Sequence, residues 1–190
     1  MEIQQSFLES RNLVHLNKLN IKNKNKIRIK KALLIELERE KANTKRIISR
    51  LNNESFGYKP HEKSMTLGEL TNHIVELHNW VSFVLSKETF DFHVDYIPTK
   101  LTSVDDLLSK LESDFEKNKA IIEQMDEAIV FEEWALKAGD HVIAAMPKTG
   151  ALRFIVTNHL IHHRGQLTVY MRLLDIPVPG IYGPSADDKV

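Results

Sequence analysis

The sequence predicts an all-α protein, a four-helix bundle, and three observations support this prediction. Apolar residues recur at the helical period in four separate segments, and polar or proline-containing stretches separate these segments. The chain has 190 residues, 42% of them hydrophobic, and its formal charges balance, as in a single globular domain with a core. Four helices with one apolar face each can bury those faces together in a bundle.

The first helix is expected from about Arg28 to Leu51. Its apolar face comprises Leu33, Leu34, Leu37, Thr44, Ile47, Ile48 and Leu51. Charged residues cover the opposite side, as in a helix with one face in water. The polar stretch 52–57 ends this helix, and Pro60 prevents an early restart.

The second helix has the clearest start, a capping box formed by Thr66 and Glu69. In such a box the threonine hydroxyl accepts from the amide of the glutamate, whose side chain reaches back. Met65 and Leu70 fit the hydrophobic contact that accompanies it. The helix is expected to continue to about Leu85. Its apolar face comprises Leu67, Leu70, Ile74, Leu77, Trp80, Val81 and Val84, with His73 among them.

The third helix is expected to follow an irregular stretch, residues 87–101, and to be capped by Thr102 or Ser103. Asp105 and Asp106 suit its first turn, because acidic groups interact favourably with the amino end of a helix. Its apolar face comprises Val104, Leu108, Leu111, Phe115, Ile122 and Met125.

The fourth helix is expected to start after Pro147 and to reach about Leu174. Its apolar face comprises Leu152, Val156, His159, His163, Leu167, Tyr170 and Leu174. Before it, residues 128–147 interrupt the helical pattern, and two short apolar runs there could form a small hairpin between helices 3 and 4. Residues 176–190 contain three prolines and are expected to form an ordered or partly ordered tail.

The charge distribution divides the chain into a basic N-terminal extension, residues 1–28, and a bundle domain, residues 29–188. Residues 1–31 contain eight Lys or Arg and two Glu, a net charge of +6. A basic arm can contact nucleic acid, but this one has no recognisable nucleic-acid-binding motif. A solvated arm is therefore favoured over a nucleic-acid partner.

Other features of the chain concern its location and its redox chemistry. No apolar run approaches the roughly 20 residues that span a bilayer, and the first residues lack the pattern of a secretory signal. We therefore expect no membrane partner and a cytoplasmic location. The chain contains no cysteine, which excludes disulfides, thiolate metal sites and a cysteine nucleophile. A thiol reaction would need its thiol as a cosubstrate.

Three histidines on apolar faces are the candidate metal ligands. His159 and His163 are four residues apart in the fourth helix, so their Cβ atoms should be about 5–6 Å apart on one face. Two imidazoles at this spacing can bind one ion from adjacent turns, and His73 has a similar position on the second helix. A divalent ion would satisfy one nitrogen of each ring. The alternative is three ordinary core histidines with other hydrogen-bond partners.

Several residues close to these histidines in the sequence have more than one possible role. Glu76 lies one turn after the histidine of the second helix and is interpreted as an exposed ion-pairing residue rather than as its partner. Arg164 has two equal interpretations, the binding of an anionic substrate and pairing with an acid. His162 is expected behind the site or at the surface. Gln166 and Tyr170 could line the cavity, with core packing preferred for Tyr170.

A centre of three neutral histidines would have catalytic properties. It would leave a divalent ion its charge of about +2 and at least one open position, as in catalytic rather than structural zinc sites. Leu160 follows His159 where the zinc proteases have a glutamate base, which weakens a peptidase interpretation. With no other obvious carboxylate base, direct activation of the nucleophile by the metal is favoured.

These motifs resemble the DinB family, the DinB-like and YfiT-like group of metal-binding proteins, from about residue 30 to residue 188. The matching segments are 64–70 followed by His73, 159–167 and 179–184. The resemblance implies a four-helix bundle with a divalent ion, zinc or nickel among others, on His73, His159 and His163. It also implies a homodimer, and for some relatives a transferase or isomerase activity with low-molecular-weight thiols such as bacillithiol or mycothiol.

The function expected from these observations is that of a divalent-metal-dependent enzyme. It would be a low-molecular-weight-thiol S-transferase or a hydrolase in stress or detoxification, acting on a small-molecule substrate. The alternative is a non-catalytic stress or interaction protein that the metal merely stabilises.

Overall fold

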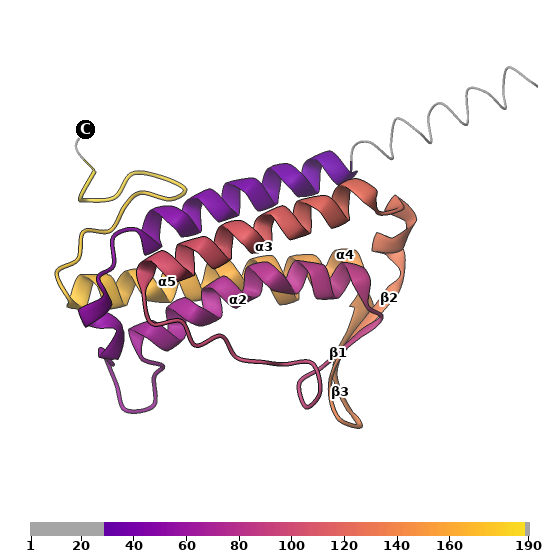
Figure 1. Cartoon of the computed structure of the whole chain (residues 1–190), viewed down its shortest axis with the longest axis horizontal. Coiled ribbons are helices and arrows are strands. Elements are labelled where there is room, and N and C mark those ends of the chain that lie inside the picture. The colour runs from indigo at the N-terminus through magenta and orange to yellow at the C-terminus, as the bar shows by residue number, and fades with distance from the viewer. Residues whose placement is uncertain (1–28, 189–190) are drawn as a thin grey trace, which may run out of the picture.

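Four long helical elements lie side by side in the computed structural model, which describes residues 29–188 (Figure 1). The elements are the first helix (residues 29–48), α2 (Leu67–Ser86), α3 (Val104–Gln124), and the consecutive segments α4 (Lys148–Gly150), η3 (Ala151–Thr157) and α5 (Asn158–Leu173). The predicted four-helix architecture is confirmed. The predicted basic extension, residues 1–28, lies outside the described residues. None of the described helices is both long and apolar enough to cross a membrane.

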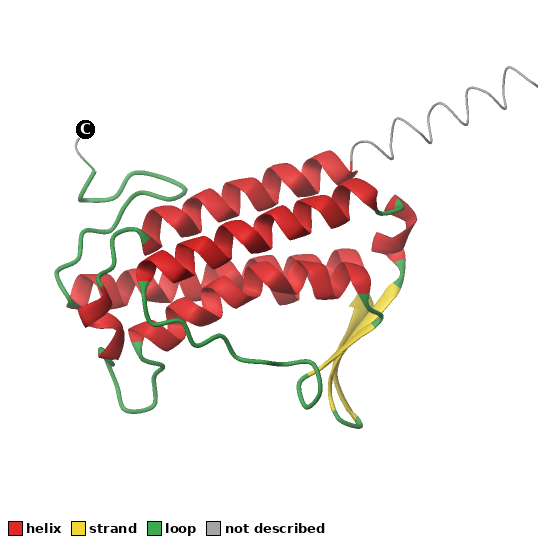
Figure 2. Ribbon diagram, viewed as in Figure 1, coloured by secondary structure: helices red, strands yellow, loops and turns green. Residues whose placement is uncertain are grey.

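A three-stranded sheet lies at one end of the helices (Figure 2). It has the order β1-β2-β3, formed by β1 (Thr89–Asp91), β2 (Glu133–Ala138) and β3 (His141–Pro147). The antiparallel β2–β3 pair confirms the predicted hairpin. β1 corrects the expectation that residues 87–101 are wholly irregular. It has only three residues and pairs in parallel with β2. Its formation depends on this distant segment, and no local alternation of side chains predicts it.

The helix starts follow the capping pattern of the sequence. Glu69 N donates to Thr66 Oγ1 at 3.1 Å, and Thr66 N donates to Glu69 Oε2 at 2.8 Å, so the capping box of α2 is complete. Ser103, rather than Thr102, caps α3 and accepts from Asp106 N. Two short 3-10 helices, η1 (Asn53–Gly57) and η2 (Glu127–Phe131), connect the longer elements.

Polar side chains share the buried face of the bundle with the apolar ones. On α3 the buried face runs through Leu107, Asp114 and Asn118, whereas Leu108 is only half-buried. The face predicted from the apolar residues is therefore centred to one side of the face that is buried in the structure. Because Asp114 and Asn118 are polar, the spacing of the apolar residues could not mark the true centre of the face.

The fourth helix has the expected extent but not a uniform period. Residues Ala151–Thr157 form a π-helix, in which each amide bonds five residues back. A π-helix has more residues per turn than an α-helix, so an α-helical period extrapolated through it misplaces the residues that follow. Leu160 and Arg164 consequently occupy the buried face, and His159 and His163 lie half-buried beside it. This corrects their expected placement in the apolar core.

Candidate metal centre

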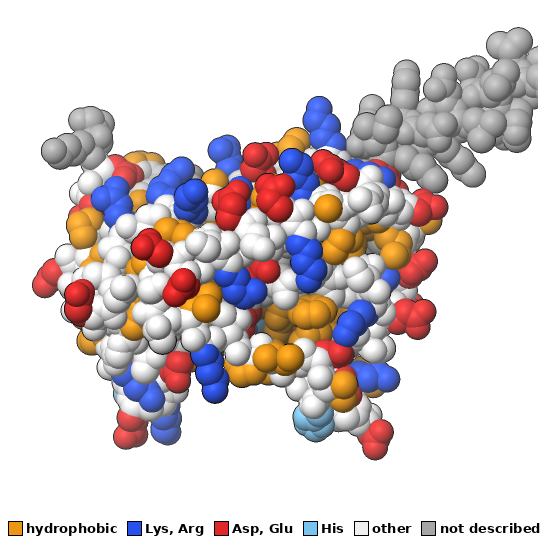
Figure 3. All heavy atoms as spheres, viewed as in Figure 1, with side chains coloured by type: hydrophobic (Ala, Val, Ile, Leu, Met, Phe, Trp, Pro, Cys, Tyr) orange, Lys and Arg blue, Asp and Glu red, His pale blue; other side chains and the backbone are white. Residues whose placement is uncertain are grey.

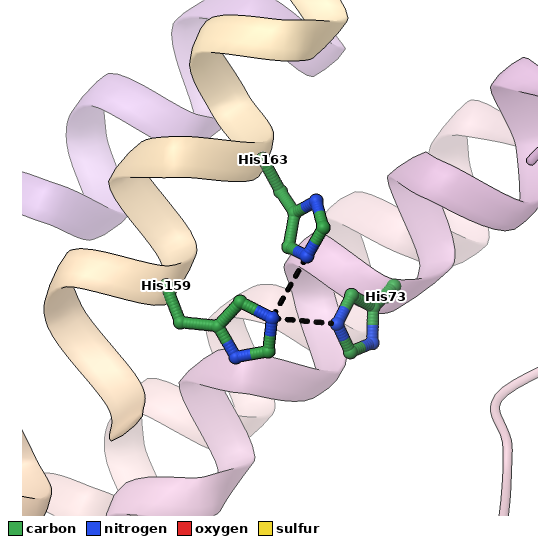
Figure 4. A group of neighbouring side chains, drawn as sticks. All are labelled: His73, His159 and His163. Atoms are coloured by element: carbon green, nitrogen blue, oxygen red, sulfur yellow. Dashed lines mark hydrogen bonds between the residues drawn. The ribbon is translucent and has the colours of Figure 1, made fainter. Parts of the chain in front are cut away.

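Folding brings together three histidines from two helices, called here the histidine cluster. His73 lies on the second turn of α2, and His159 and His163 lie on successive turns of α5 (Figure 4). The Nε2 atom of His159 is 3.4 Å from that of His73 and 2.8 Å from that of His163. One ring nitrogen from each residue lies within 4.8 Å of the others, so the cluster could hold a metal ion.

The nitrogen separations are close to those of a metal site. Nitrogens bound at 2.0–2.1 Å to a tetrahedral ion are about 3.4 Å apart, which is the separation between His73 and His159. The 2.8 Å separation on α5 is shorter and needs a small rotation of one imidazole. The donor set of three imidazoles could therefore hold a metal ion.

The Nδ1 atoms of two of the rings face an acceptor on the same helix. These acceptors are Glu76 Oε2 at 3.3 Å from His73 and Gln166 Oε1 at 2.7 Å from His163, and His159 has a hydrogen bond with the backbone of Ile155. A hydrogen bond donated from Nδ1 fixes the proton there and leaves Nε2 as a lone pair. The Nε2 atoms of His73 and His163 both lie beside Nε2 of His159, so one ligand atom of each ring is available to a single cation.

Burial keeps the α5 histidines uncharged. Burial is the largest cause, and together with the nearby imidazoles of His163 and His73 it lowers the pKa of His159 to about 4. Burial also lowers the pKa of His163, although its hydrogen bond to Gln166 opposes that shift. Neutral imidazole is the form that binds metals, so these residues are ready to act as ligands at neutral pH.

Glu76 is buried and orients a histidine, which corrects its interpretation as an exposed ion-pairing residue. Besides His73, its carboxylate accepts from the Tyr96 hydroxyl at 3.2 Å and from the backbone amide of Thr99. Burial alone would raise the pKa of Glu76, but the hydrogen bonds from His73 and Thr99 outweigh it and hold the pKa below its usual value. The carboxylate is therefore charged and occupied, and it is not a free general base.

An aromatic wall covers one side of the cluster. The Trp80 ring lies 6.4 Å from the His73 ring and 6.3 Å from the His159 ring between centroids. Phe90 of β1 packs on Trp80 at 5.0 Å, so the small sheet supports the wall. In the view of Figure 3, apolar side chains gather on the surface between the helices and the sheet. The sequence placed Trp80 on the apolar face but not beside the histidines.

The other side of the cluster faces open space. A cavity of about 790 Å³ is lined by Asn72, His73 and Glu76 of α2 and by residues 98–102, which cross in front of that helix. Ligand sites for small molecules have volumes of about 300–1,000 Å³. The cavity therefore offers room for a small molecule beside His73, the member of the cluster that lines it.

Arg164 is paired with an acid, which decides between its two interpretations. Its side chain is buried, and Nη2 donates to Glu40 Oε2 at 2.5 Å and to the Tyr182 hydroxyl at 2.5 Å. Nη1 donates to Thr44 Oγ1, which also contacts His78 Nε2 at 3.0 Å. Arg164 thus joins the first helix, α5 and the tail, and it is not exposed to a substrate.

The remaining candidates lie outside the cluster. Tyr170 is buried and donates to the Met65 carbonyl at 3.0 Å, in agreement with core packing. His162 is exposed. Gln166 contacts His163 rather than lining the cavity. Gln166 follows His163 and Glu76 follows His73 by the same three residues, a spacing that could have identified both partners from the sequence.

The fold and the cluster define a class, a helical bundle with a three-histidine centre that could hold a metal ion. The chain belongs to the DinB family, whose model matches residues 22–189.

The chain is also similar to individual proteins. The chain is 26% identical over 149 residues to the uncharacterized protein YrdA of Bacillus subtilis, a match that covers 76% of this chain and 83% of YrdA. Its fold is similar to the crystal structure of the DinB-like protein YjoA of Bacillus subtilis, with a TM-score of 0.61, 22% identity, and coverage of 81% and 99% of the two chains. A DinB-like protein from Bacillus cereus gives a TM-score of 0.55 at 24% identity, with coverage of 75% and 91%.

Proposed function

We propose that this protein is a divalent-metal-dependent enzyme in which His73, His159 and His163 hold the ion. The observation that carries the proposal is the convergence of three Nε2 atoms, with Nδ1 of His73 and of His163 each engaged by an acceptor. Imidazole ligands suit zinc and nickel, the two metals favoured here. Membership of the DinB family supports a metal centre at these positions.

The surroundings of the cluster support a catalytic role. His73, His159 and His163 would hold the ion, which would supply a lowered pKa to a thiol or water bound to it. The chain's own residues orient the imidazoles through their Nδ1 partners and exclude water on the Trp80 side. They also leave a cavity beside His73. The Glu76 carboxylate already accepts from His73, Tyr96 and Thr99, so we assign activation of the nucleophile to the metal rather than to this carboxylate.

The reaction we favour is S-transfer from a low-molecular-weight thiol, with hydrolysis as the related reaction in which water replaces the thiol. The sulfur attacks an electrophilic carbon, a C–S bond forms, the leaving group departs with its electron pair, and the thiol proton passes to solvent. The chain has no cysteine, so the thiol enters as a cosubstrate. We further propose that the protein is a cytoplasmic homodimer that acts in stress response or detoxification.

The test is an assay of S-transfer with a panel of thiols, bacillithiol included, and chloronitrobenzene-type electrophiles. We expect turnover by zinc- or nickel-loaded protein, no turnover after chelation, and a loss of at least 100-fold in His159→Ala. The control is His162→Ala, which changes an exposed histidine three residues away and should retain activity. The absence of metal-dependent turnover with every pair, in protein that binds metal, would reject the catalytic role in favour of a stabilising one.

A further inference from the structure

The outer face of the fourth helical element differs from the outer faces of the first helix and α3. Those two helices expose many charged side chains, which are Lys31, Glu38, Arg39, Lys45 and Arg46 on the first helix and Asp105, Asp106, Glu116, Lys117 and Glu123 on α3. Residues 154–171, in contrast, contain one charged residue, Arg164, and it is buried. The fourth helical element therefore exposes a face without lysine, arginine or carboxylate groups.

This face forms a continuous stripe, called here the outer stripe. It comprises exposed residues that recur every three or four positions: Phe154, Asn158, His162, Gly165, Val169 and Leu173. Residues at this spacing are neighbours on a helix, and the stripe is about 29 Å long at 1.5 Å per residue. Phe154 is 62% exposed, Val169 56% and Leu173 57%. Exposed apolar residues that line up in this way indicate an interaction surface rather than scattered exposure.

Gly165, near the middle of the outer stripe, is not required by the packing of one chain. It lies inside α5, where glycine destabilises a helix relative to alanine. A Cβ at this position would have nothing within 4 Å, so no neighbouring group excludes a side chain. A position without a side chain allows a second helix to approach closely. A partner on the outer stripe therefore gives this glycine a physical role.

The charges at the two ends of the stripe are already paired within the chain. Arg153 pairs with Glu36, and Arg172 pairs with Asp187. A strongly charged partner would therefore find no free counter-charge along the stripe. Two copies of the stripe could meet without an unpaired like charge between them, which favours a second copy of this chain as the partner.

The order of residues in the stripe is self-complementary. In a two-fold interface each contact is made twice, once by each copy. An axis midway between positions 162 and 165 places His162 of one copy opposite Gly165 of the other. The same axis places Asn158 opposite Val169 and Phe154 opposite Leu173. The imidazole then faces the gap at the glycine, and the apolar ends of the stripe face each other.

We propose that two copies of this chain associate through the outer stripe, with the two α5 helices antiparallel about a two-fold axis. The proposal rests on the proposed function only for the expectation of a homodimer, and it adds the interface. A contact along one helix is small among specific interfaces, so the dissociation constant is expected to be on the order of 10 μM. The histidine cluster lies within one chain, so the dimer and the metal centre are tested separately.

The experiment measures the mass of the full-length protein by sedimentation equilibrium from about 1 μM to about 300 μM, a range that brackets the expected constant. The test variant, Gly165→Leu, adds a side chain where one copy has open space. The matched control, Ala120→Leu, adds the same side chain at an exposed position of α3. Leucine favours a helix more than glycine does, so the unfolding midpoint of Gly165→Leu in dilute solution should not fall below that of the wild type.

A second pair of variants tests the antiparallel register. Val169→Glu places a carboxylate in the interface and should weaken association. Addition of Asn158→Lys should restore it, because positions 158 and 169 face each other between copies. Within one chain these positions are about 16 Å apart along the helix, so an ion pair there forms only between copies.

We expect a monomer–dimer equilibrium for the wild type and Ala120→Leu, and association at least tenfold weaker for Gly165→Leu and for Val169→Glu. A wild type that stays monomeric at the highest concentration overturns the proposal, and so does a stripe that residues 1–28 cover. Unchanged association of Gly165→Leu also overturns it, and the homodimer of the proposed function then forms through another surface. Failure of Asn158→Lys to restore the dimer overturns the antiparallel arrangement. Metal content, measured in parallel, reports on the histidine cluster alone.

Discussion

Replacement of Glu76 by glutamine tests whether the Nδ1 partners prepare the histidine cluster for metal. In the wild type the carboxylate accepts from His73, Tyr96 and Thr99. Glutamine keeps one oxygen, presents an amino group in place of the other, and loses the charge. The His73 ring is then less firmly oriented, and its Nε2 becomes less basic.

The size of the effect follows from these contacts. Loss of an outer partner of a metal-binding histidine costs 10–100-fold in metal affinity, or about 1.4–2.7 kcal/mol. The metal-free protein should also lose about 1–2 kcal/mol in unfolding free energy, because bonds to a charged acceptor become bonds to a neutral one. Affinity is measured by zinc competition with a chromogenic chelator, and stability by urea unfolding.

Glu69→Gln is the matched control for this variant. Glu69 is also a hydrogen-bonded carboxylate on α2, but it contacts no histidine, and glutamine can maintain a capping box. Its zinc affinity should equal that of the wild type. A zinc affinity of Glu76→Gln within twofold of the wild type would refute the orienting role, and Glu76→Asp offers a second carboxylate variant if the glutamine form fails to fold.

Two further predictions concern the buried polar groups. Arg164→Met leaves the Glu40 carboxylate buried without its cation and should lower the unfolding free energy by about 3–5 kcal/mol in urea unfolding; a change below 1 kcal/mol would contradict the pairing. His78 is neutral when folded, because burial and then the charges of Arg164 and Lys41 lower its pKa from 6.5 to about 3. The unfolded chain therefore takes up this proton first, and stability should fall by about 1.4 kcal/mol per pH unit as pH drops from 6.5 towards 3. In metal-free protein, His78→Asn should weaken this dependence, and an identical pH slope in both proteins would exclude His78 as its source.

The elements that depend on a local pattern could be predicted from the sequence. The capping box at Thr66 and the four helical periods are local, and they predict the helices to within a few residues. The spacing of His159 and His163 likewise places two ligands on one face. His73 could be chosen only because a buried imidazole needs partners, an argument that does not depend on its distance along the chain.

The features that could not be predicted from the sequence depend on contacts between distant segments. β1 exists because residues near Thr89 pair with residues near Ala135. Glu76 is buried because residues 96–99 return over α2, and Arg164 is paired because Glu40 faces it from the first helix. Within α5 the buried face includes Arg164, a polar residue that the apolar pattern could not mark, and His159 and His163 lie half-buried beside that face.

The metal content of the purified, untagged protein tests the three-histidine centre most directly. It is measured by mass spectrometry on the wild type, on His159→Ala and His163→Ala, and on the exposed-site control His162→Ala. We expect about one divalent ion per chain in the wild type and in the control, and its loss in both cluster variants. A wild type that holds no metal after reconstitution, or cluster variants that retain it, would contradict the centre and leave three histidines that only pack between α2 and α5.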